Sequence, residues 1–126
     1  MKHNIFVYGS LKRNGRFFSQ IKKEVSLIND DCYVRGILVS LGKYPAMVDG
    51  IGKVWGELFS ITEKGIQICD QIEGYEPGKD VVYYPVHKTV YELDGFCLAK
   101  DAVVYIINPL NVDFCWNNET ASWKLG

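Results

Sequence analysis

The pair Asp94–Gly95 constrains the fold of this chain more than any other feature. It separates two runs rich in β-branched and aromatic residues, VYYPVHKTVYEL and FCLAKDAVVYII. An Asp-Gly pair between such runs is a strong signal for a two-residue β-hairpin turn. We therefore expect two long antiparallel strands, with Tyr83 on the first and Tyr105 on the second, and no helix between residues 86 and 93.

The rest of the chain shows further strand patterns and one weak helical pattern. Residues 4–8, 31–40 and 53–61 have strand character, because apolar residues dominate or alternate in them. Residues 16–24 are weakly amphipathic, which favours a short helix. We expect residues 42–50 to be extended or turn-like, since they contain a Tyr-Pro pair.

A second helix is predicted over residues 63–73. Thr62 is a favourable N-cap, and Gly74 is a natural stop. Apolar residues at helical spacing form one face of this segment: Ile66, Cys69 and Ile72. These elements together predict an α+β fold, a small curved sheet or barrel with short helices, in one domain spanning residues 1–126.

Composition and charge exclude several classes of protein. The net charge of −1 lacks the basic excess of a nucleic-acid-binding protein. The four cysteines are far apart and only two histidines exist, which argues against a zinc site. No apolar stretch approaches the roughly 20 residues that cross a bilayer, and the first apolar run is too short for a signal peptide. We therefore expect a cytoplasmic protein without a membrane span, while the sequence leaves the oligomeric state open.

The stretch Tyr8-Gly9-Ser10-Leu11 follows the first predicted strand. Glycine permits close backbone approach to a ligand, and successive N–H groups in a tight turn can bind a carboxylate or oxyanion. By itself, such a stretch is more often a simple strand-ending turn. Ser10 is not a convincing nucleophile, because no serine-hydrolase pattern accompanies it.

Glu73 is the last residue before the predicted helix stop at Gly74. The negative end of the helix dipole and the nearby Asp70 and Glu76 are expected to raise its pKa. A glutamate tuned in this way suits a general base near neutral pH. By itself, however, such a residue is more often a solvated glutamate at a helix end.

Taken together and in order along the chain, several landmarks resemble the γ-glutamylcyclotransferase-like family, which includes AIG2-like and γ-glutamylamine cyclotransferase-like proteins. The family opens with a strand and a YG[ST]L loop and places its catalytic glutamate in an LDxxEG-type helix end, where this chain has Cys69 for the leucine. The other matching stretches are Lys43–Val48, Gly56-Glu57-Leu58, Val104–Tyr105 and Ser122–Trp123.

This resemblance implies a fold and a reaction. The fold is a small mixed, mostly antiparallel β-barrel with short flanking helices. The reaction closes the γ-glutamyl group of an amine or peptide to 5-oxoproline and releases a free amine. Glu73 would be the catalytic acid and base, and no metal or cofactor would be needed. The substrate-binding residues would be Tyr8, Gly9, Ser10, Leu11 and Tyr105, although a core or rim tyrosine is an equal interpretation for the last.

One departure from the family pattern leaves alternatives open. Pro85 stands two residues after Tyr83, where many members have an arginine. A non-catalytic module that binds small acids or a partner therefore remains an alternative. A related enzyme acting on a γ-glutamyl group of a protein lysine or a biosynthetic intermediate is another. Glu57, which alternates with apolar residues on a predicted strand, is a weaker functional candidate.

Overall fold

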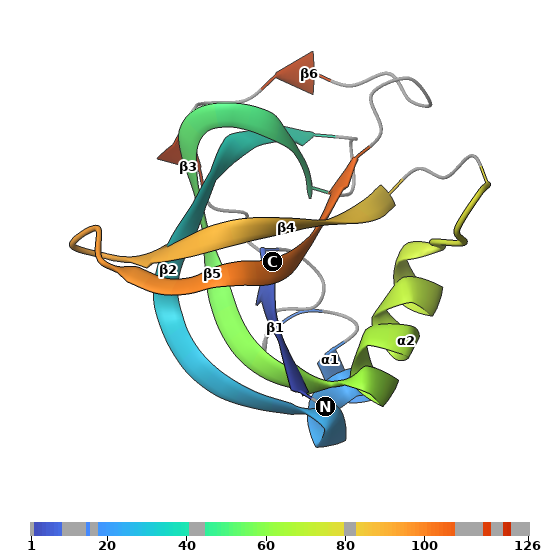
Figure 1. The fold of residues 1–126 in the computed structure, drawn as a ribbon. Coiled ribbons are helices and arrows are strands. Elements are labelled where there is room, and N and C mark those ends of the chain that lie inside the picture. Colours follow the sequence, from blue (N-terminus) through green and yellow to red (C-terminus); the bar gives the residue numbers. More distant parts are fainter. Residues whose placement is uncertain are drawn as a thin grey trace.

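A computed structural model describes residues 2–8, 15, 18–40, 45–79, 83–107, 115–116 and 120–121 (Figure 1). The elements in chain order are β1 (Lys2–Val7), α1 (Phe18–Ile21), the 3-10 helix η1 (Lys22–Glu24), β2 (Val25–Ser40), β3 (Pro45–Thr62), α2 (Glu63–Glu73), β4 (Tyr83–Glu92), β5 (Cys97–Ile107), β6 (Cys115–Trp116) and β7 (Thr120–Ala121).

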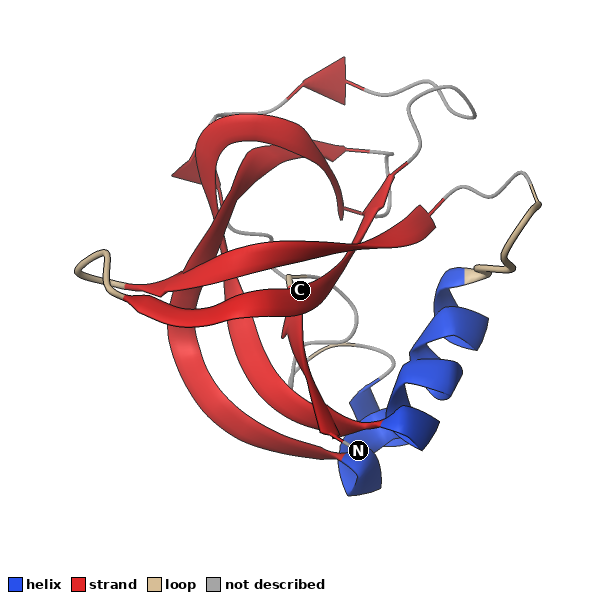
Figure 2. Cartoon of the chain, in the orientation of Figure 1, coloured by secondary structure: helices blue, strands red, loops and turns tan. Residues whose placement is uncertain are grey.

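Within the described residues, five strands close into a barrel. The strand order is β2-β4-β5-β1-β3, and β3 pairs again with β2. The β1–β5 contact is parallel, whereas the β1–β3, β2–β3, β2–β4 and β4–β5 pairs are antiparallel. Figure 2 shows the strands wrapping around one another with the helices gathered at one side. The predicted mixed, mostly antiparallel barrel with flanking helices is confirmed.

The β4–β5 hairpin forms as predicted, with Tyr83 on β4 and Tyr105 on β5. Its turn differs in one detail. The amide of Gly95 donates to the carbonyl of Glu92 at 2.8 Å, and the amide of Glu92 donates to the carbonyl of Phe96 at 2.8 Å. The loop therefore has three residues, and Gly95 takes a φ of 94°, as the last position of such a loop requires.

The two longest strands exceed the predicted ranges. β2 begins six residues before the predicted residue 31, and β3 takes in residues 45–50, which were expected to be extended or turn-like. Their pairing contains register shifts between Leu27 and Asn29, between Asn29 and Cys32, and between Arg35 and Ile37. Each shift breaks the alternation of apolar and polar residues, so the pattern conceals the continuity of the strands.

Both predicted helices are present. The range 63–73 is confirmed as α2, and the described part of the range 16–24 forms α1 followed by η1. No helix in the described part of the chain has the length and apolar character needed to cross a bilayer.

Alternate residues along β1 and its next residue, Tyr8, belong to two different cores. Phe6 and Tyr8 join the cluster that fills the barrel, together with residues of all the other barrel strands. Ile5 and Val7 join the cluster between the barrel and α2, which includes Cys69. The period-2 alternation of a strand explains this division. It places the end of β1 at the junction of the barrel interior and the helix.

Candidate active site

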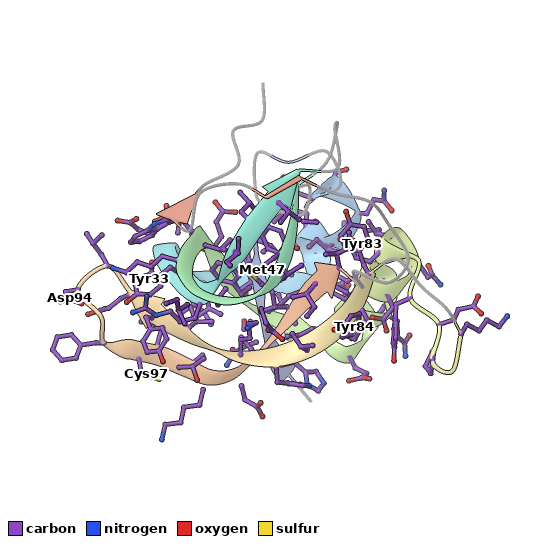
Figure 3. All side chains as sticks on the ribbon, turned by 90° about the horizontal axis from the view of Figure 1, so that it is seen from above. Tyr33, Met47, Tyr83, Tyr84, Asp94 and Cys97 are labelled. Carbon is purple, nitrogen blue, oxygen red and sulfur yellow. The ribbon has the colours of Figure 1, made fainter. Side chains whose placement is uncertain are left out.

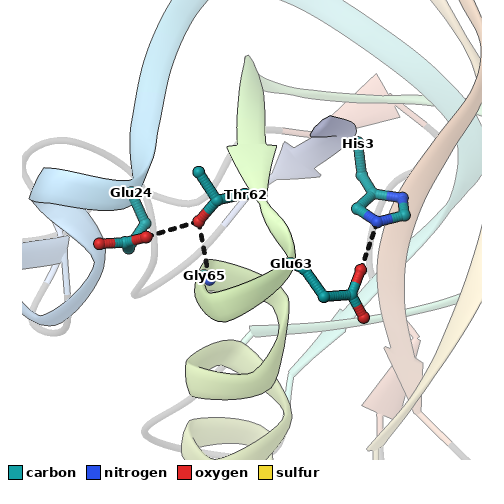
Figure 4. A network of polar contacts seen from close by, with 5 residues as sticks. All are labelled: His3, Glu24, Thr62, Glu63 and Gly65. Atoms are coloured by element: carbon teal, nitrogen blue, oxygen red, sulfur yellow. Dashed lines mark hydrogen bonds and ion pairs between the residues drawn. The ribbon is translucent and has the colours of Figure 1, made fainter. Parts of the chain in front are cut away.

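Polar contacts fix the beginning of α2 against the barrel (Figure 4). The Thr62 hydroxyl accepts from the amide of Gly65 at 3.1 Å and donates to Oε1 of Glu24 at 2.6 Å. Nε2 of His3 lies 2.5 Å from Oε2 of Glu63. The first contact satisfies a free N–H of the first turn, as an N-cap does. The other two join the helix to η1 and β1.

The end of α2 is closed by a Schellman motif. The amide of Gly74 donates to the carbonyl of Gln71 at 3.2 Å, and that of Tyr75 donates to the carbonyl of Asp70 at 2.8 Å. Gly74 has a φ of 72°, a left-handed conformation that favours glycine. The helix therefore ends sharply, and Glu73 is its last residue.

Two tyrosine hydroxyls connect the end of β1, strand β5 and α2. The Tyr8 hydroxyl donates to the backbone carbonyl of Tyr105 at 2.6 Å. The Tyr105 hydroxyl donates to Oδ1 of Asp70 at 2.5 Å. Both tyrosines are buried. The hydroxyl of Tyr105, predicted to bind substrate, is therefore directed to the helix.

The carboxyl group of Glu73 is the acid of this region whose pKa departs from its ordinary value. The residue is half-buried, and burial raises the pKa of its carboxyl to about 7. The expected direction is thus found, but its cause is different. Asp70 accepts a hydrogen bond from Tyr105, and Glu76 lies on the surface with its carboxylate 2.9 Å from Nζ of Lys79. Removal of water from Glu73, and not repulsion by these two carboxylates, accounts for the higher pKa.

The electrostatic influence of Glu73 shows which groups surround it. Burial first, and then the charge of Glu73, raises the pKa of Tyr8, and Tyr83 adds to this effect. Burial, followed by the charges of Glu73 and Asp70, raises the pKa of the Cys69 thiol to about 12. Burial, then Asp70, raises the pKa of Tyr105, with a smaller part from Glu73. The structure thus brings Glu73 into the neighbourhood of Tyr8 and Tyr105.

The remaining predicted loop residues, Gly9, Ser10 and Leu11, lie outside the described residues. Tyr8 marks the point from which that loop departs. Its position depends on Gly56 of β3, where an added Cβ would come within 2.1 Å of the carbonyl oxygen of Val7 and 2.7 Å of the Phe6 ring. Any larger residue at position 56 would push the end of β1 away from β3.

Glu57 is buried beside this junction, with 6% of its surface exposed. It is paired with Val7 in the β1–β3 register, so it shares the face of the barrel from which Val7 projects. Among the described residues, Glu57 is the one charged residue that is buried. From the sequence it was only a weak functional candidate. Its alternation with Leu58, which faces the barrel interior, was the signal that it lies on the opposite face, toward α2.

The pKa values of Glu73 and of the buried cysteines indicate which chemistry the site can perform. A carboxyl group with a pKa of about 7 can accept and return a proton at neutral pH. The buried thiols of Cys32 and Cys69 each have a pKa raised to about 12, first by burial, so neither supplies a thiolate. Acid–base chemistry by Glu73 is therefore better supported here than nucleophilic chemistry by these cysteines.

Comparisons with known proteins agree with this architecture. The family model "Gamma-glutamyl cyclotransferase, AIG2-like" matches residues 5–125. A protein of Halalkalibacterium halodurans, named "Putative gamma-glutamylcyclotransferase BH1612", is 31% identical over 84 residues, which are 64% of this chain and 71% of that protein.

Two solved structures share the fold. The first is YkqA from Bacillus subtilis, with a TM-score of 0.69 and 24% identity over 86% of this chain; the match spans only 36% of YkqA. The second is an AIG2-like protein from Mus musculus, with a TM-score of 0.64, 22% identity, and coverage of 83% of this chain and 76% of that one. With the family match covering nearly the whole sequence, the chain belongs to the γ-glutamylcyclotransferase, AIG2-like family.

Proposed function

We propose that this protein is a γ-glutamylcyclotransferase that converts a γ-glutamyl amine or peptide to 5-oxoproline and a free amine. The α-nitrogen of the glutamyl group attacks its own γ-carbonyl carbon, and the bond from that carbon to the leaving nitrogen breaks. Because nucleophile and carbonyl belong to one molecule, holding the substrate in a folded conformation lowers the barrier without a nucleophilic side chain.

The observation that carries this proposal is the carboxyl of Glu73, with its pKa raised to about 7 by burial. An α-amine has a pKa of roughly 8 and is largely protonated at pH 7. On becoming the lactam N–H, the α-nitrogen loses two protons. Glu73 takes the first before the attack and passes it to the leaving nitrogen, then takes the second as the ring closes and passes it to the released amine, so Glu73 ends as it began and the amine leaves as an ammonium ion. A carboxyl with a pKa near the working pH is suited to both steps.

The backbone of the Tyr8–Leu11 loop would hold the glutamyl group. Tyr8, the described residue of this loop, is fixed by its hydrogen bond to the carbonyl of Tyr105. Successive N–H groups after a strand suit the carboxylate and the developing oxyanion of such a substrate. Tyr105 supports the loop through that carbonyl and contacts Asp70 through its hydroxyl. We assign the binding role to this loop and no role to a metal or cofactor.

The test is release of 5-oxoproline from a panel of γ-glutamyl amines, γ-glutamyl dipeptides and γ-glutamyl-lysine in a protein-bound form. We expect turnover of at least one class by the wild type and its loss in Glu73→Gln. Equal turnover by the two proteins would exclude Glu73 as the base.

Binding of γ-glutamyl compounds without turnover would instead indicate the non-catalytic module. One observation favours this second function, binding without catalysis. Pro85, where many family members have an arginine, pairs directly with Tyr105 across β4 and β5. The departure from the family pattern therefore lies next to the candidate site.

A further inference from the structure

Strand β3 carries a bulge, residues 49–52, opposite β2. From the pair Arg35–Lys53 to the pair Ile37–Val48, the chain advances two positions along β2 but five along β3. The extra residues contact side chains of β2 and β4. Oδ1 of Asp49 accepts from Nζ of Lys88 at 3.1 Å, and the carbonyl of Ile51 accepts from Nη1 of Arg35 at 3.1 Å. Bulges are frequent beside binding sites, because they redirect side chains.

A cavity lies next to this bulge, where β2 and β4 separate. Among the described residues these strands pair at two positions, Cys32 with Glu92 and Tyr33 with Tyr91. Beyond the second pair is a cavity of about 190 Å³. Its lining residues are Arg35, Lys88, Thr89 and Tyr91. We refer to it as the Arg35 cavity.

The positive charges around the Arg35 cavity are poorly balanced. Arg35 and Lys53 are direct cross-strand partners, and both lie over the ring of Tyr33, at 5.4 Å and 4.8 Å from its centroid. Like charges placed directly opposite destabilise a sheet. In the described part of the chain, neither cation is ion-paired with a carboxylate. Of the three cations Arg35, Lys53 and Lys88, the carboxylate of Asp49 pairs with Lys88.

The cavity is separate from the Glu73 region. Figure 3 places Tyr33 on the side of the hairpin tip, near Asp94, and Tyr83 at the other end of the barrel beside α2. Among the described residues, those that line the cavity form no hydrogen bond with Tyr8, Asp70 or Tyr105. The charge imbalance therefore needs an explanation other than the proposed reaction.

We propose that the Arg35 cavity binds a small anion with a phosphoryl group. The planar guanidinium of Arg35 offers a fork of donors that fits phosphate oxygens, and Lys88 adds a compact positive charge. The lining is completed by Thr89, whose hydroxyl donates to the carbonyl of Lys100 at 3.5 Å, and by Tyr91, whose ring stacks on that of Tyr33. An anion between these groups would offset the repulsion of Arg35 and Lys53.

The experiment is a titration of the intact protein with inorganic phosphate, followed by amide NMR shifts at constant ionic strength maintained with chloride. We expect saturable shifts at residues 35 and 88–91. Arg35→Gln and Lys88→Gln should each weaken phosphate binding by about tenfold or more, the usual consequence of losing a charge-assisted hydrogen bond. Lys64→Gln, which removes an exposed lysine of α2, is the matched control and should bind as the wild type does.

Two results would overturn the proposal. One is a linear, non-saturating response spread over the surface, which indicates only general attraction of anions. The other is equal affinity in Lys88→Gln, Lys64→Gln and the wild type. Lys88→Gln keeps the test decisive if Arg35→Gln does not fold, since it leaves the contact of Arg35 with the Ile51 carbonyl in place.

Discussion

Helix α2 has a glutamate at each end, and the two carboxylates occupy opposite environments. Glu63 lies in the first turn with 61% of its side chain exposed, and it is close to His3. Glu73 is the last residue of the helix and is half-buried beside the barrel. The first position is favourable for a negative charge and the second is unfavourable, because the helix dipole reverses between them.

The difference separates a structural role from a chemical one. At the first turn, water and the dipole both favour the charged carboxylate, so Glu63 stabilises the helix by an ordinary surface interaction. At the last turn, burial disfavours the charge, and the pKa of Glu73 rises to about 7. At neutral pH the carboxyl of Glu73 can therefore both accept and release a proton. Its burial in the charged form lowers the free energy of unfolding.

The strongest way to break this comparison is to neutralise each glutamate in turn. Glu73→Gln keeps the shape but cannot accept a proton, so we expect turnover to fall by about two to four orders of magnitude. Glu63→Gln makes the same chemical change at the other end and should leave turnover within about twofold of the wild type. The measurement is 5-oxoproline release by both variants at saturating substrate. Similar losses in both would show that the position on the helix does not matter.

The second prediction concerns the pH dependence of stability. The folded protein binds the Glu73 proton up to a pH of about 7, whereas the carboxyl of the unfolded chain releases it near its ordinary value of 4.5. The wild type should therefore lose stability as the pH rises between these values, by roughly 1 to 3 kcal/mol. Glu73→Gln lacks this loss.

Urea unfolding of both proteins at pH 5, 6, 7 and 8 tests this. The free energy of unfolding of Glu73→Gln, relative to that of the wild type, should increase over this range. A constant difference would mean that the carboxyl of Glu73 has the same pKa in both states.

The third prediction concerns the hydrogen bond between Tyr105 and Asp70, which attaches α2 to β5 near Glu73. Tyr105→Phe and Asp70→Ala each remove one partner of the same hydrogen bond. Each should lower the free energy of unfolding by about 1.5 kcal/mol, the scale of a bond to a charged group. The double variant should be little worse than either single one. Fully additive losses in a double-mutant cycle would show that the two side chains act independently.

The smallest effect is expected at the first turn. Thr62→Ala removes the cap that accepts from the Gly65 amide and should cost about 1 kcal/mol. Thr62→Ser keeps a hydroxyl and is the matched control. Turnover per folded molecule should not change in either variant, because the cap lies eleven residues from Glu73. A fall in turnover of Thr62→Ala at a temperature where it is fully folded would contradict the separation of the two ends.

Local signals in the sequence were sufficient for several elements. Thr62 and Gly74 delimit α2 because capping depends on residue type and not on distant contacts. Asp94 and Gly95 identify the hairpin for the same reason. The direction of the pKa shift of Glu73 was also predicted, from its place at a helix end, although burial is its cause.

Features that depend on distant contacts were not predictable in this way. The hydrogen bond from Tyr105 to Asp70 joins residues 35 positions apart, and it removes Asp70 from the role expected for it beside Glu73. The bulge of β3 depends on the pairing register between β2 and β3, which the alternation of apolar and polar residues does not encode. The roles of Gly9, Ser10 and Leu11 stay predictions, since these residues lie outside the described part of the chain.

The most direct measurement is an NMR titration of the side-chain carboxyl carbon of Glu73, with the chain labelled at glutamate and the signal assigned by comparison with Glu73→Gln. The central claim is that burial raises the pKa of this carboxyl to about 7, so that it can accept and release a proton at neutral pH. The midpoint should then lie near 7, in agreement with a pKa raised to about 7, and the acidic limb of 5-oxoproline formation should share it. A midpoint near 4.5, the ordinary value, would contradict the claim.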